Sequence, residues 1–385
     1  MSGPSLPRVV HVTADHPDVL VEAKTPVIAR LVDLVSDRFD NRVISLNRKS
    51  PPALSMAWPR LRVEEAGHGG SVTTLAYHAP PAGLHHWRML RALGEDLAKR
   101  IAKDGKPSLL IAHKLTVEGV AVERAAELLG VPYAVSIQGN TDEKILKVRR
   151  DLHGRLARIF HGAAHVFPFT PWALAAVEKR LGRRSGPITL LPCALADDTM
   201  IPPRDGGEGL VTAFHLRNAR LKGLDLMGDA ARSVPGARLT VLGGGSEAEI
   251  AAAKALGGPD ISFAGAVANA EIKARFNAAK GFVMPSRRES FGLVFIEALF
   301  AGCPIAYPAG AAVDGYFDDC PFAVRVKPGD TASVAAAMQF LTERETQLKQ
   351  ALAQWQPTEE AARFTRPAIA VAFARGIQSA IGAAG

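Results

Sequence analysis

The sequence predicts an α/β protein built from two domains, each with a doubly wound parallel sheet. Short apolar runs of strand length alternate with helical patterns along the chain, which is the order typical of parallel sheets. The length of 385 residues is large for one domain. The stretch at residues 196–208 is rich in Pro, Gly and Asp and indicates a linker. We therefore expect domains at residues 1–195 and 196–365, followed by a segment at residues 366–385.

In the first domain, the expected strands are buried apolar runs at Val9–Val12, Val43–Leu46, Ser108–Ala112, Pro132–Ile137, Val166–Thr170 and Ile188–Pro192. Helical patterns separate them, starting at Pro26, covering about residues 85–106, 117–129 and 143–160, and resuming at Pro171. In the second domain, we expect strands at Leu210–Phe214, Arg238–Leu242, Ile261–Ala264, Phe282–Met284 and Pro304–Tyr307. Its helices follow Gly223, cover about residues 269–279 and 290–302, and close the chain at residues 367–381.

Charge is unevenly distributed between the two halves. Residues 1–195 contain 27 Lys and Arg against 18 Asp and Glu, whereas the rest of the chain contains 19 against 20. The net charge of +8 therefore belongs to the first domain. This asymmetry favours an anionic partner, with a phospholipid surface, a lipid diphosphate or nucleic acid as candidates. Nucleic acid is disfavoured because the basic half has no aromatic-interleaved platform for single strands.

The cysteine content and the N-terminus indicate a reducing compartment. Three cysteines are too few for a disulfide framework, and no pair has metal-site spacing. The N-terminus lacks an apolar core of signal-peptide length. We expect a cytoplasmic protein, with peripheral contact at the inner face of a membrane as an open alternative.

Two carboxylates frame the segment at residues 281–303, GFVMPSRRESFGLVFIEALFAGC. The order of an apolar run, a polar turn and a second apolar run predicts strand, loop and helix, with Ser290 as N-cap and Gly302 as C-cap. A membrane span is the alternative, but the Gly and Pro residues that follow and the acid inside argue against it. Glu289 precedes the helix, and Glu297 lies among apolar neighbours, where a charge requires a partner. Glu297 is therefore a candidate ligand-binding acid.

This segment resembles the E-x7-E signature of retaining glycosyltransferases of family 4, the glycosyl transferases group 1. Glu289 and Glu297 have the required spacing, and the resemblance covers about residues 209–345, with a looser likeness in the N-terminal half. It implies the GT-B fold, in which two Rossmann-like domains face a central cleft and a C-terminal helix crosses back to the first domain. It also assigns donor-binding positions directly after the first acid: Ser290, Phe291, Gly292 and Leu293.

The resemblance extends to the loop after the first strand of the second domain. Arg217 and Lys222 match the family's G-R-x4-K-G element, with Leu216 where glycine is usual. In the family these cations hold the donor diphosphate, and two cations near a helix N-terminus also suit a dianion physically. The chain contains no Asp-x-Asp motif, so the resemblance implies chemistry without a metal or cofactor. Gly243 and Gly244 fall where the family has a glycine turn near the nucleotide.

The resemblance implies different roles for Glu289 and Glu297. Glu289 would position the donor sugar, and Glu297 would accept two hydrogen bonds from the ribose diol. A pair of hydrolase acids is the alternative, but Glu297 on the helix and Glu289 just before its start indicate one binding edge rather than opposite faces of a glycosidic bond.

Polar residues at strand exits are the candidates in the first domain. Parallel sheets bind ligands at the carboxyl ends of their strands, so Asp15, His16 and Asp18 are expected near a cleft. Gln138 and Asp142 follow the fourth expected strand and resemble the family's His-Gly-x-Asp loop. Gln138 replaces the histidine, and it can bond a hydroxyl but cannot carry a proton.

Two basic stretches in this domain are open to two interpretations. The helix at residues 85–106 has an apolar stripe and several cations, which is compatible with an anionic lipid surface or with an ordinary surface helix. The stretch at residues 143–160 carries six cations, for which a solvated face is the usual meaning.

Together these features predict a retaining, metal-independent hexosyltransferase. Its donor would be a nucleoside-diphosphate sugar, and its acceptor a lipid-linked or polysaccharide intermediate of bacterial envelope or exopolysaccharide biosynthesis. The alternatives are a GT-B sugar-nucleotide epimerase and a non-catalytic nucleotide-sugar or lipid-binding protein.

Overall fold

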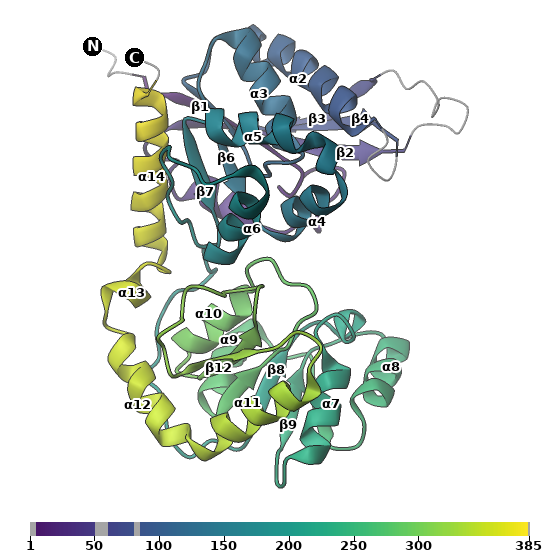
Figure 1. Ribbon diagram of the computed structural model, residues 1–385, viewed down its shortest axis with the longest axis vertical. Coiled ribbons are helices and arrows are strands. Elements are labelled where there is room, and N and C mark those ends of the chain that lie inside the picture. The colour runs from purple at the N-terminus through teal and green to yellow at the C-terminus, as the bar shows by residue number, and fades with distance from the viewer. Residues whose placement is uncertain (1–4, 51–60, 81–84, 384–385) are drawn as a thin grey trace. The chain divides into compact units, whose positions relative to one another are not determined.

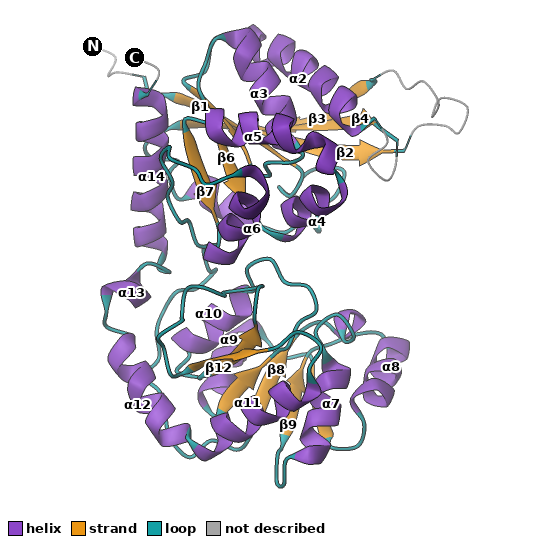
Figure 2. Cartoon of the chain, viewed as in Figure 1, coloured by secondary structure: helices purple, strands orange, loops and turns teal. Residues whose placement is uncertain are grey.

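The computed structural model describes residues 5–50, 61–80 and 85–383, and the chain forms two compact units (Figure 1). Unit 1 comprises residues 1–169, 173–194 and 366–385. Unit 2 comprises residues 170–172 and 195–365. Each unit has its own parallel sheet with covering helices, so the fold class predicted from the sequence is confirmed (Figure 2).

Unit 1 contains a seven-stranded sheet in the order β3-β4-β2-β1-β5-β6-β7. All neighbours are parallel except β3 and β4, which pair as an antiparallel hairpin at one edge. The strands are β1 (Arg8–Thr13), β2 (Asp40–Lys49), β3 (Val63–Gly69), β4 (Val72–His78), β5 (Leu109–Ala112), β6 (Tyr133–Ile137) and β7 (His165–Pro168). The central strands are short apolar runs because both of their faces are covered.

The helices of unit 1 are α1 (Val27–Asp33), α2 (His86–Lys103), α3 (Glu118–Leu129), α4 (Asn140–Val148), the 3-10 helix η3 (Arg150–Leu152), α5 (His153–Gly162), α6 (Pro171–Leu181) and α14 (Arg366–Gly382). Most of them connect these strands by crossovers, whereas α6 and α14 follow the last strand of the sheet. Helices α2 and α3 pack closely, and a Cβ on Gly94 would lie 2.4 Å from the carbonyl oxygen of Ala121. Only glycine allows this approach.

The C-terminal helix α14 packs on the sheet of unit 1. Phe373 meets Phe167 edge to face at 5.2 Å between ring centroids. One turn later, a Cβ on Gly376 would lie 2.3 Å from the Phe167 ring, so glycine is required for the helix to lie this close. The last helix therefore belongs to the same unit as the first strand, although nearly the whole chain separates them.

Unit 2 contains a six-stranded, fully parallel sheet in the order β10-β9-β8-β11-β12-β13. Its strands are β8 (Leu210–Ala213), β9 (Leu239–Leu242), β10 (Ile261–Gly265), β11 (Gly281–Val283), β12 (Ile305–Pro308) and β13 (Ala323–Val326). Its helices are the 3-10 helix η4 (Leu216–Asn218), α7 (Leu224–Ser233), α8 (Glu247–Gly257), α9 (Asn269–Asn277), α10 (Leu293–Phe300), α11 (Thr331–Glu343), α12 (Glu345–Trp355) and α13 (Glu359–Ala362).

Aromatic packing fixes the helix that carries the second acid. Phe295 of α10 meets Phe282 of β11 edge to face at 5.5 Å between ring centroids. Phe282 in turn meets Phe276 of α9 at 5.3 Å. Burying three such rings together stabilises the contact of both helices with the sheet. This packing fixes the orientation of α10, the helix that carries Glu297.

Three local predictions differ from the structure. The expected helix at residues 143–160 is divided into α4, η3 and α5, because Leu146 and Leu152 are both buried, whereas one continuous helix would place them about 120° apart around its axis. The expected strand at Ile188–Pro192 is reduced to an isolated bridge between Ile188 and Val166.

The third difference lies at the start of α10. The helix begins at Leu293, and its N-cap is Gly292 with φ of 74° rather than Ser290. A Cβ on Gly292 would lie 2.6 Å from the Phe295 ring, so the packing of that ring favours glycine at this position.

Candidate functional site

Two of the predicted catalytic side chains meet at the carboxyl edge of the sheet in unit 2. Lys222 lies in the loop after β8, and Glu289 lies in the loop after the neighbouring strand β11. The Nζ of Lys222 is 2.5 Å from Oε2 of Glu289, and both side chains are largely buried. The backbone N–H of Ser290 donates to the other oxygen, Oε1, at 3.2 Å. Adjacent parallel strands thus place a cation and an anion from distant sequence positions in one contact.

A second ion pair ties the same two loops together. Both guanidinium Nη atoms of Arg287 lie 2.7 Å from the two carboxylate oxygens of Asp225, at the start of α7. Arg287 also donates from Nη1 to the carbonyl of Arg220 at 2.6 Å and from its backbone N–H to the carbonyl of Leu221 at 2.8 Å. Burial opposes the ionisation of Asp225, but Arg287 outweighs it, and the pKa of Asp225 is lowered. This pairing could not be predicted from the sequence, because Arg287 stands in a polar run with another arginine.

The N-terminus of α10 adjoins the Lys222–Glu289 contact. Its N-cap residue, Gly292, provides no side chain to accept from the first backbone N–H groups of the helix. A Cβ at this position would also lie 3.0 Å from Cγ of Glu289, so the helix start and the acid are in close contact. Phe291 is buried, and Leu293 forms the first residue of the helix. The positive end of the α10 dipole can therefore act on an anion here.

A pocket of about 350 Å³ lies along the glycine turn after β9 and contains the second predicted acid, Glu297. Gly243 and Gly244 form one wall, and a Cβ on Gly243 would lie 1.9 Å from the carbonyl oxygen of Phe214. The other lining residues are mostly apolar: Ala213, Phe214, His215, Leu242, Ala266, Val267, Ile272, Phe276 and Val294. An apolar pocket with one carboxylate suits a ligand that combines a flat ring with hydroxyl groups nearby.

Arg217 has different surroundings from Lys222. It lies in η4, where its backbone N–H donates to Nδ1 of His215 at 3.3 Å, and its side chain is exposed. The pKa of Glu249 in α8 is lowered first by a hydrogen bond from the N–H of Ser246, with contributions from the charges of His215 and Arg217. The two predicted diphosphate cations thus flank the end of β8, one facing Glu289 and the other closer to α8.

In unit 1, Asp15 is part of a buried charge cluster at the ends of β1 and β5. Its Oδ2 lies 2.5 Å from Nζ of Lys114, which is also 3.7 Å from Oε1 of Glu118. The same Glu118 oxygen accepts from the backbone N–H of Ala14 at 2.8 Å. Burial raises the pKa of Glu118, and for Lys114 the two carboxylates outweigh burial and raise its pKa as well. Lys114 directly follows the exit of a predicted strand, so the rule that identified Asp15 could have found it too.

Asp142 and Gln138 contribute polar atoms that have no hydrogen-bond partner among the described residues. Asp142, in the first turn of α4, accepts with Oδ1 from the N–H of Thr116 at 2.9 Å and from its hydroxyl at 2.7 Å. Burial raises the pKa of this carboxyl. Its Oδ2 and the Nε2 of Gln138 are buried and unpaired within the described part of the chain. Such orphan atoms are where a hydroxyl-bearing ligand gains hydrogen bonds.

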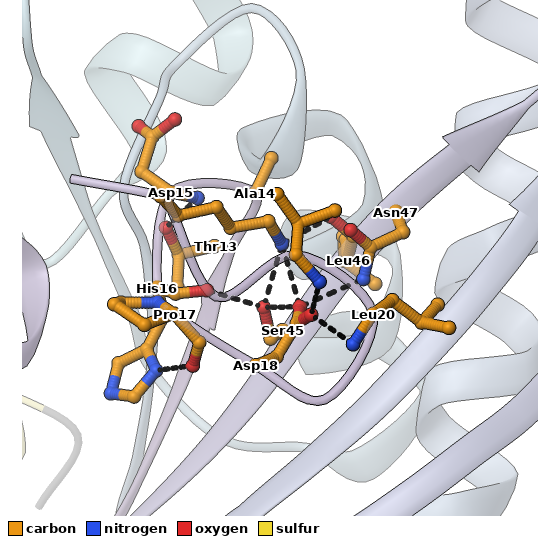
Figure 3. A network of polar contacts seen from close by, with 12 residues as sticks. Thr13, Ala14, Asp15, His16, Pro17, Asp18, Leu20, Ser45, Leu46 and Asn47 are labelled. Atoms are coloured by element: carbon orange, nitrogen blue, oxygen red, sulfur yellow. Dashed lines mark hydrogen bonds and ion pairs between the residues drawn. The ribbon is translucent and has the colours of Figure 1, made fainter.

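Asp18 organises the loop after β1 (Figure 3). Its Oδ2 accepts from Ser45, Asn47 and Lys24 at 2.6 to 2.8 Å, and its Oδ1 accepts from the N–H groups of Leu20 and Val21. Burial opposes the ionisation of Asp18, but these bonds outweigh it and lower its pKa. We therefore assign Asp18 to the structure of the loop rather than to substrate contact.

The two other predicted residues of this loop take different directions. His16 bonds the carbonyl of Pro17 through Nδ1 at 2.7 Å. The carboxylate of Asp15 points away from the Asp18 network (Figure 3), toward Lys114. Of the two, only Asp15 takes part in the buried charge cluster.

The described residues contain no group of three or more His, Cys, Asp or Glu that could hold a metal ion. Within the same residues, no helix is long and apolar enough to cross a membrane.

Comparison with known proteins found a family model and a curated relative that each match part of the chain. Residues 209–344 match the family model of the glycosyl transferases group 1. A stretch of 171 residues is 30% identical to mannosylfructose-phosphate synthase of Agrobacterium fabrum, and the match spans only 38% of this chain and 38% of that relative.

Solved structures resemble the chain over almost its whole length. Sucrose-phosphate synthase of Thermosynechococcus elongatus superposes with a TM-score of 0.69 at 19% identity, covering 98% of this chain and all of that one. The apo lipopolysaccharide outer core galactosyltransferase WaaB gives 0.67 at 12% identity over 97% and 99%. Anabaena HepE in complex with UDP and glucose gives 0.63 at 14% identity over 97% and 100%. The fold is therefore GT-B.

Proposed function

We propose that the protein is a retaining, metal-independent hexosyltransferase that uses a nucleoside-diphosphate sugar. The observation that carries this proposal is the contact of Lys222 with Glu289 beside the N-terminus of α10, which lies in the segment that matches the group 1 family model. A sugar nucleotide already contains a good leaving group, so the protein has to orient the sugar and stabilise the departing diphosphate.

We assign the donor to unit 2. The diphosphate would lie between Lys222, Arg217 and the uncapped N–H groups of α10, including those near Phe291 and Gly292. The pocket at Gly243 and Gly244 would take the nucleoside, with Glu297 accepting hydrogen bonds from the ribose diol. Glu289 would hold the hydroxyl groups of the hexose.

We propose that transfer proceeds by same-face attack. The acceptor oxygen attacks the anomeric carbon from the face on which the phosphate leaves, so the new C–O bond forms as the bond to the diphosphate breaks. The acceptor proton passes to the leaving phosphate, which needs no protein base. Gln138 fits this scheme because an amide can hold a hydroxyl but cannot accept its proton. Lys222 and Arg217 stabilise the charge that develops on the diphosphate.

We assign the acceptor to unit 1, where Asp15, Gln138 and Asp142 lie at the strand exits. A lipid-linked or polysaccharide intermediate of envelope or exopolysaccharide synthesis is our first candidate, supported by the basic surplus of this half and by the likeness to a lipopolysaccharide galactosyltransferase. A phosphorylated sugar is the second candidate, supported by the names of two relatives, mannosylfructose-phosphate synthase and sucrose-phosphate synthase.

A thermal-shift panel of UDP, GDP, ADP, TDP and NAD, first without metal and then with Mg²⁺, tests the donor site. A ligand at one hundred times its Kd adds about 2.7 kcal/mol of stability. We expect one nucleoside diphosphate to stabilise the protein without metal. Stabilisation by NAD alone, or by none of the five, would contradict the donor assignment.

Release of nucleoside diphosphate from the matching sugar nucleotide then separates the candidate activities. A transferase requires an acceptor, supplied as a sugar phosphate in one arm and as a lipid-linked saccharide in the other. An epimerase converts the donor with no acceptor, and a binding protein releases nothing. The anomeric configuration of the product, read by NMR, tests retention.

A further inference from the structure

The stretch from α4 to α5 in unit 1 exposes more cations than acids. The acid that precedes these cations on α4, Glu143, lies 3.8 Å from Arg180. Residues 144–158 contain only one acid, Asp151, and this residue pairs with Arg149 at 2.6 Å. The remaining cations of the stretch are all exposed: Lys144, Lys147, Arg150, Arg155 and Arg158. Within the described part of the chain, none of the five forms an ion pair, and the guanidinium carbon of Arg155 lies 5.1 Å from the ring centroid of Trp87.

The helix geometry groups these cations. Lys144 and Lys147 are three residues apart on α4, as are Arg155 and Arg158 on α5, so each pair shares one face of its helix. Leu146 on α4 and Leu156 on α5 are buried, which fixes the cations on the outward sides. The break at η3, with which Leu146 and Leu152 are both buried, also exposes Arg150 between the two helices.

The basic helix α2 differs in its two central arginines, whose charge is compensated by ion pairs, although Lys99 and Lys103 of the same helix are exposed. Arg91 pairs with Glu123 and Glu127 of α3 at 3.0 and 3.3 Å. Arg100 pairs with Glu65 and Asp96 at 3.2 and 2.6 Å. These arginines hold unit 1 together, so their charge is already compensated. The sequence alone does not show which arginines are paired, because most of the acids that pair with Arg91 and Arg100 come from other elements.

An aliphatic side chain stands beside the cations of α4. Val148 directly follows Lys147, lies one turn after Lys144 on the same face, and is 70% exposed. Among the described residues, most of this valine side chain is therefore left uncovered beside two lysines. An anionic lipid surface can bind such a combination. Its negatively charged headgroups attract the cations, and an apolar side chain such as Val148 can be buried at the interface.

We propose that the outward face of α4, η3 and α5, hereafter the α4–α5 face, binds the surface of an anionic phospholipid bilayer. The face would hold unit 1 at the membrane where a lipid-linked acceptor resides. This proposal does not depend on the donor site, because every residue of the face belongs to unit 1 and the donor residues belong to unit 2.

Vesicle flotation of the full-length protein tests the proposal. One set of vesicles consists of phosphatidylcholine alone, and the other contains added phosphatidylglycerol, both at low and at physiological salt. We expect binding only to the vesicles with phosphatidylglycerol, weakening as salt rises. Equal binding to both sets, or no binding to either, would overturn the proposal.

Matched triple variants locate the binding face. The first variant combines Lys144→Gln, Lys147→Gln and Arg150→Gln, and the second combines Lys99→Gln, Lys103→Gln and Lys106→Gln at the end of α2. Each removes three exposed positive charges from unit 1. At about a fivefold effect per cation, the first should lose binding on the order of one hundredfold, while the second retains most of it. An equal loss in both, or a larger loss in the second, would contradict the assignment to the α4–α5 face.

Val148→Ser separates the apolar contribution from charge. We expect a severalfold loss of vesicle binding with an unchanged salt dependence. All variants should keep the thermal midpoint of the wild type and its response to the nucleotide, which shows that the fold and the donor site are intact. Loss of vesicle binding with an intact nucleotide response therefore concerns the α4–α5 face alone.

Discussion

The Nζ of Lys222 lies 2.5 Å from Oε2 of Glu289, so a cation expected at the diphosphate and an acid expected at the sugar neutralise each other in unit 2. The pairing has a consequence for catalysis. A bound diphosphate would share the ammonium with Glu289, whose carboxylate would then become a stronger acceptor for sugar hydroxyl groups. Donor binding and sugar orientation would thus be coupled through one side chain.

Lys222→Ala should lower turnover much more than it weakens donor binding. The ammonium is most valuable when charge develops on the leaving diphosphate, and the loss of one such preorganised donor costs about 10²- to 10³-fold in kcat. Steady-state kinetics with saturating acceptor, following nucleoside diphosphate release, gives kcat and KM separately.

Arg232→Ala on α7 is the matched control for this variant. Arg232 also forms an ion pair in unit 2, with Asp229, but that pair is exposed on the helix surface. Its loss should leave both kinetic constants nearly unchanged. If Lys222→Ala raised KM alone, Lys222 would serve ground-state binding rather than the transition state.

Arg287→Lys should impair catalysis with little effect on stability. Lysine keeps the charge beside Asp225 but cannot form the two-pronged contact that joins the loops of Lys222 and Glu289. Because this pair is about a third exposed, its contribution to folding is small. We expect a severalfold to tenfold fall in kcat at an unchanged thermal midpoint. An unchanged kcat in a folded variant would show that the two loops need no such tie.

Glu297→Gln should weaken nucleotide binding selectively. An amide accepts with one oxygen and carries no charge, so the bonds to a ribose diol lose roughly 1.5 kcal/mol, or about tenfold in Kd. Isothermal titration with the nucleoside diphosphate measures this directly. The 2′-deoxy nucleotide should bind the wild type more weakly and should distinguish the variant less, since one hydroxyl is missing. The same loss in Glu271→Gln, an exposed acid of α9, would show that the effect is one of overall charge.

Much of the fold could be predicted because its signals are local. The strands of both sheets are apolar runs between turn residues, and the resemblance around Glu289 and Glu297 placed the second acid on the helix that lines the pocket. The break between α4 and α5 was missed because the burial of both Leu146 and Leu152 depends on tertiary packing, which the local pattern does not reveal.

The contacts that assemble the candidate site could not be predicted in the same way. Arg287 and Asp225 are 62 residues apart, and Asp15 and Lys114 are 99 apart. Their meeting depends on which strands are neighbours in the sheet. Strand exits give the residues that can line a site, whereas strand order decides which of them touch.

The last prediction concerns acid stability and rests on His11 and His113. The two rings are fully buried and stacked, with Nδ1 of His11 3.1 Å from Nε2 of His113. Burial lowers the pKa of His11 to about 4, although a hydrogen bond with Asn41 opposes this, and burial also lowers the pKa of His113. The unfolded chain therefore takes up protons first, below about pH 6.5. Stability is complete above that pH and is lost as the pH falls toward 4.

For His11 alone this loss is about 2 kcal/mol between pH 7 and pH 5. The protection of β1 and β5 amides from hydrogen exchange, corrected for the intrinsic pH dependence of exchange, reports this loss for unit 1.

Glu118 and Asp142 act in the opposite direction, because burial raises their pKa values and the folded state then takes up protons first. The comparison with His11→Gln removes that background, since both acids are present in the variant. We expect the variant to be less stable at pH 7 but to lose about 2 kcal/mol less on going to pH 5. Parallel pH profiles for the two proteins would show that His11 stays neutral in the unfolded chain as well, or that it is charged in the folded state, and either result would contradict the burial argument.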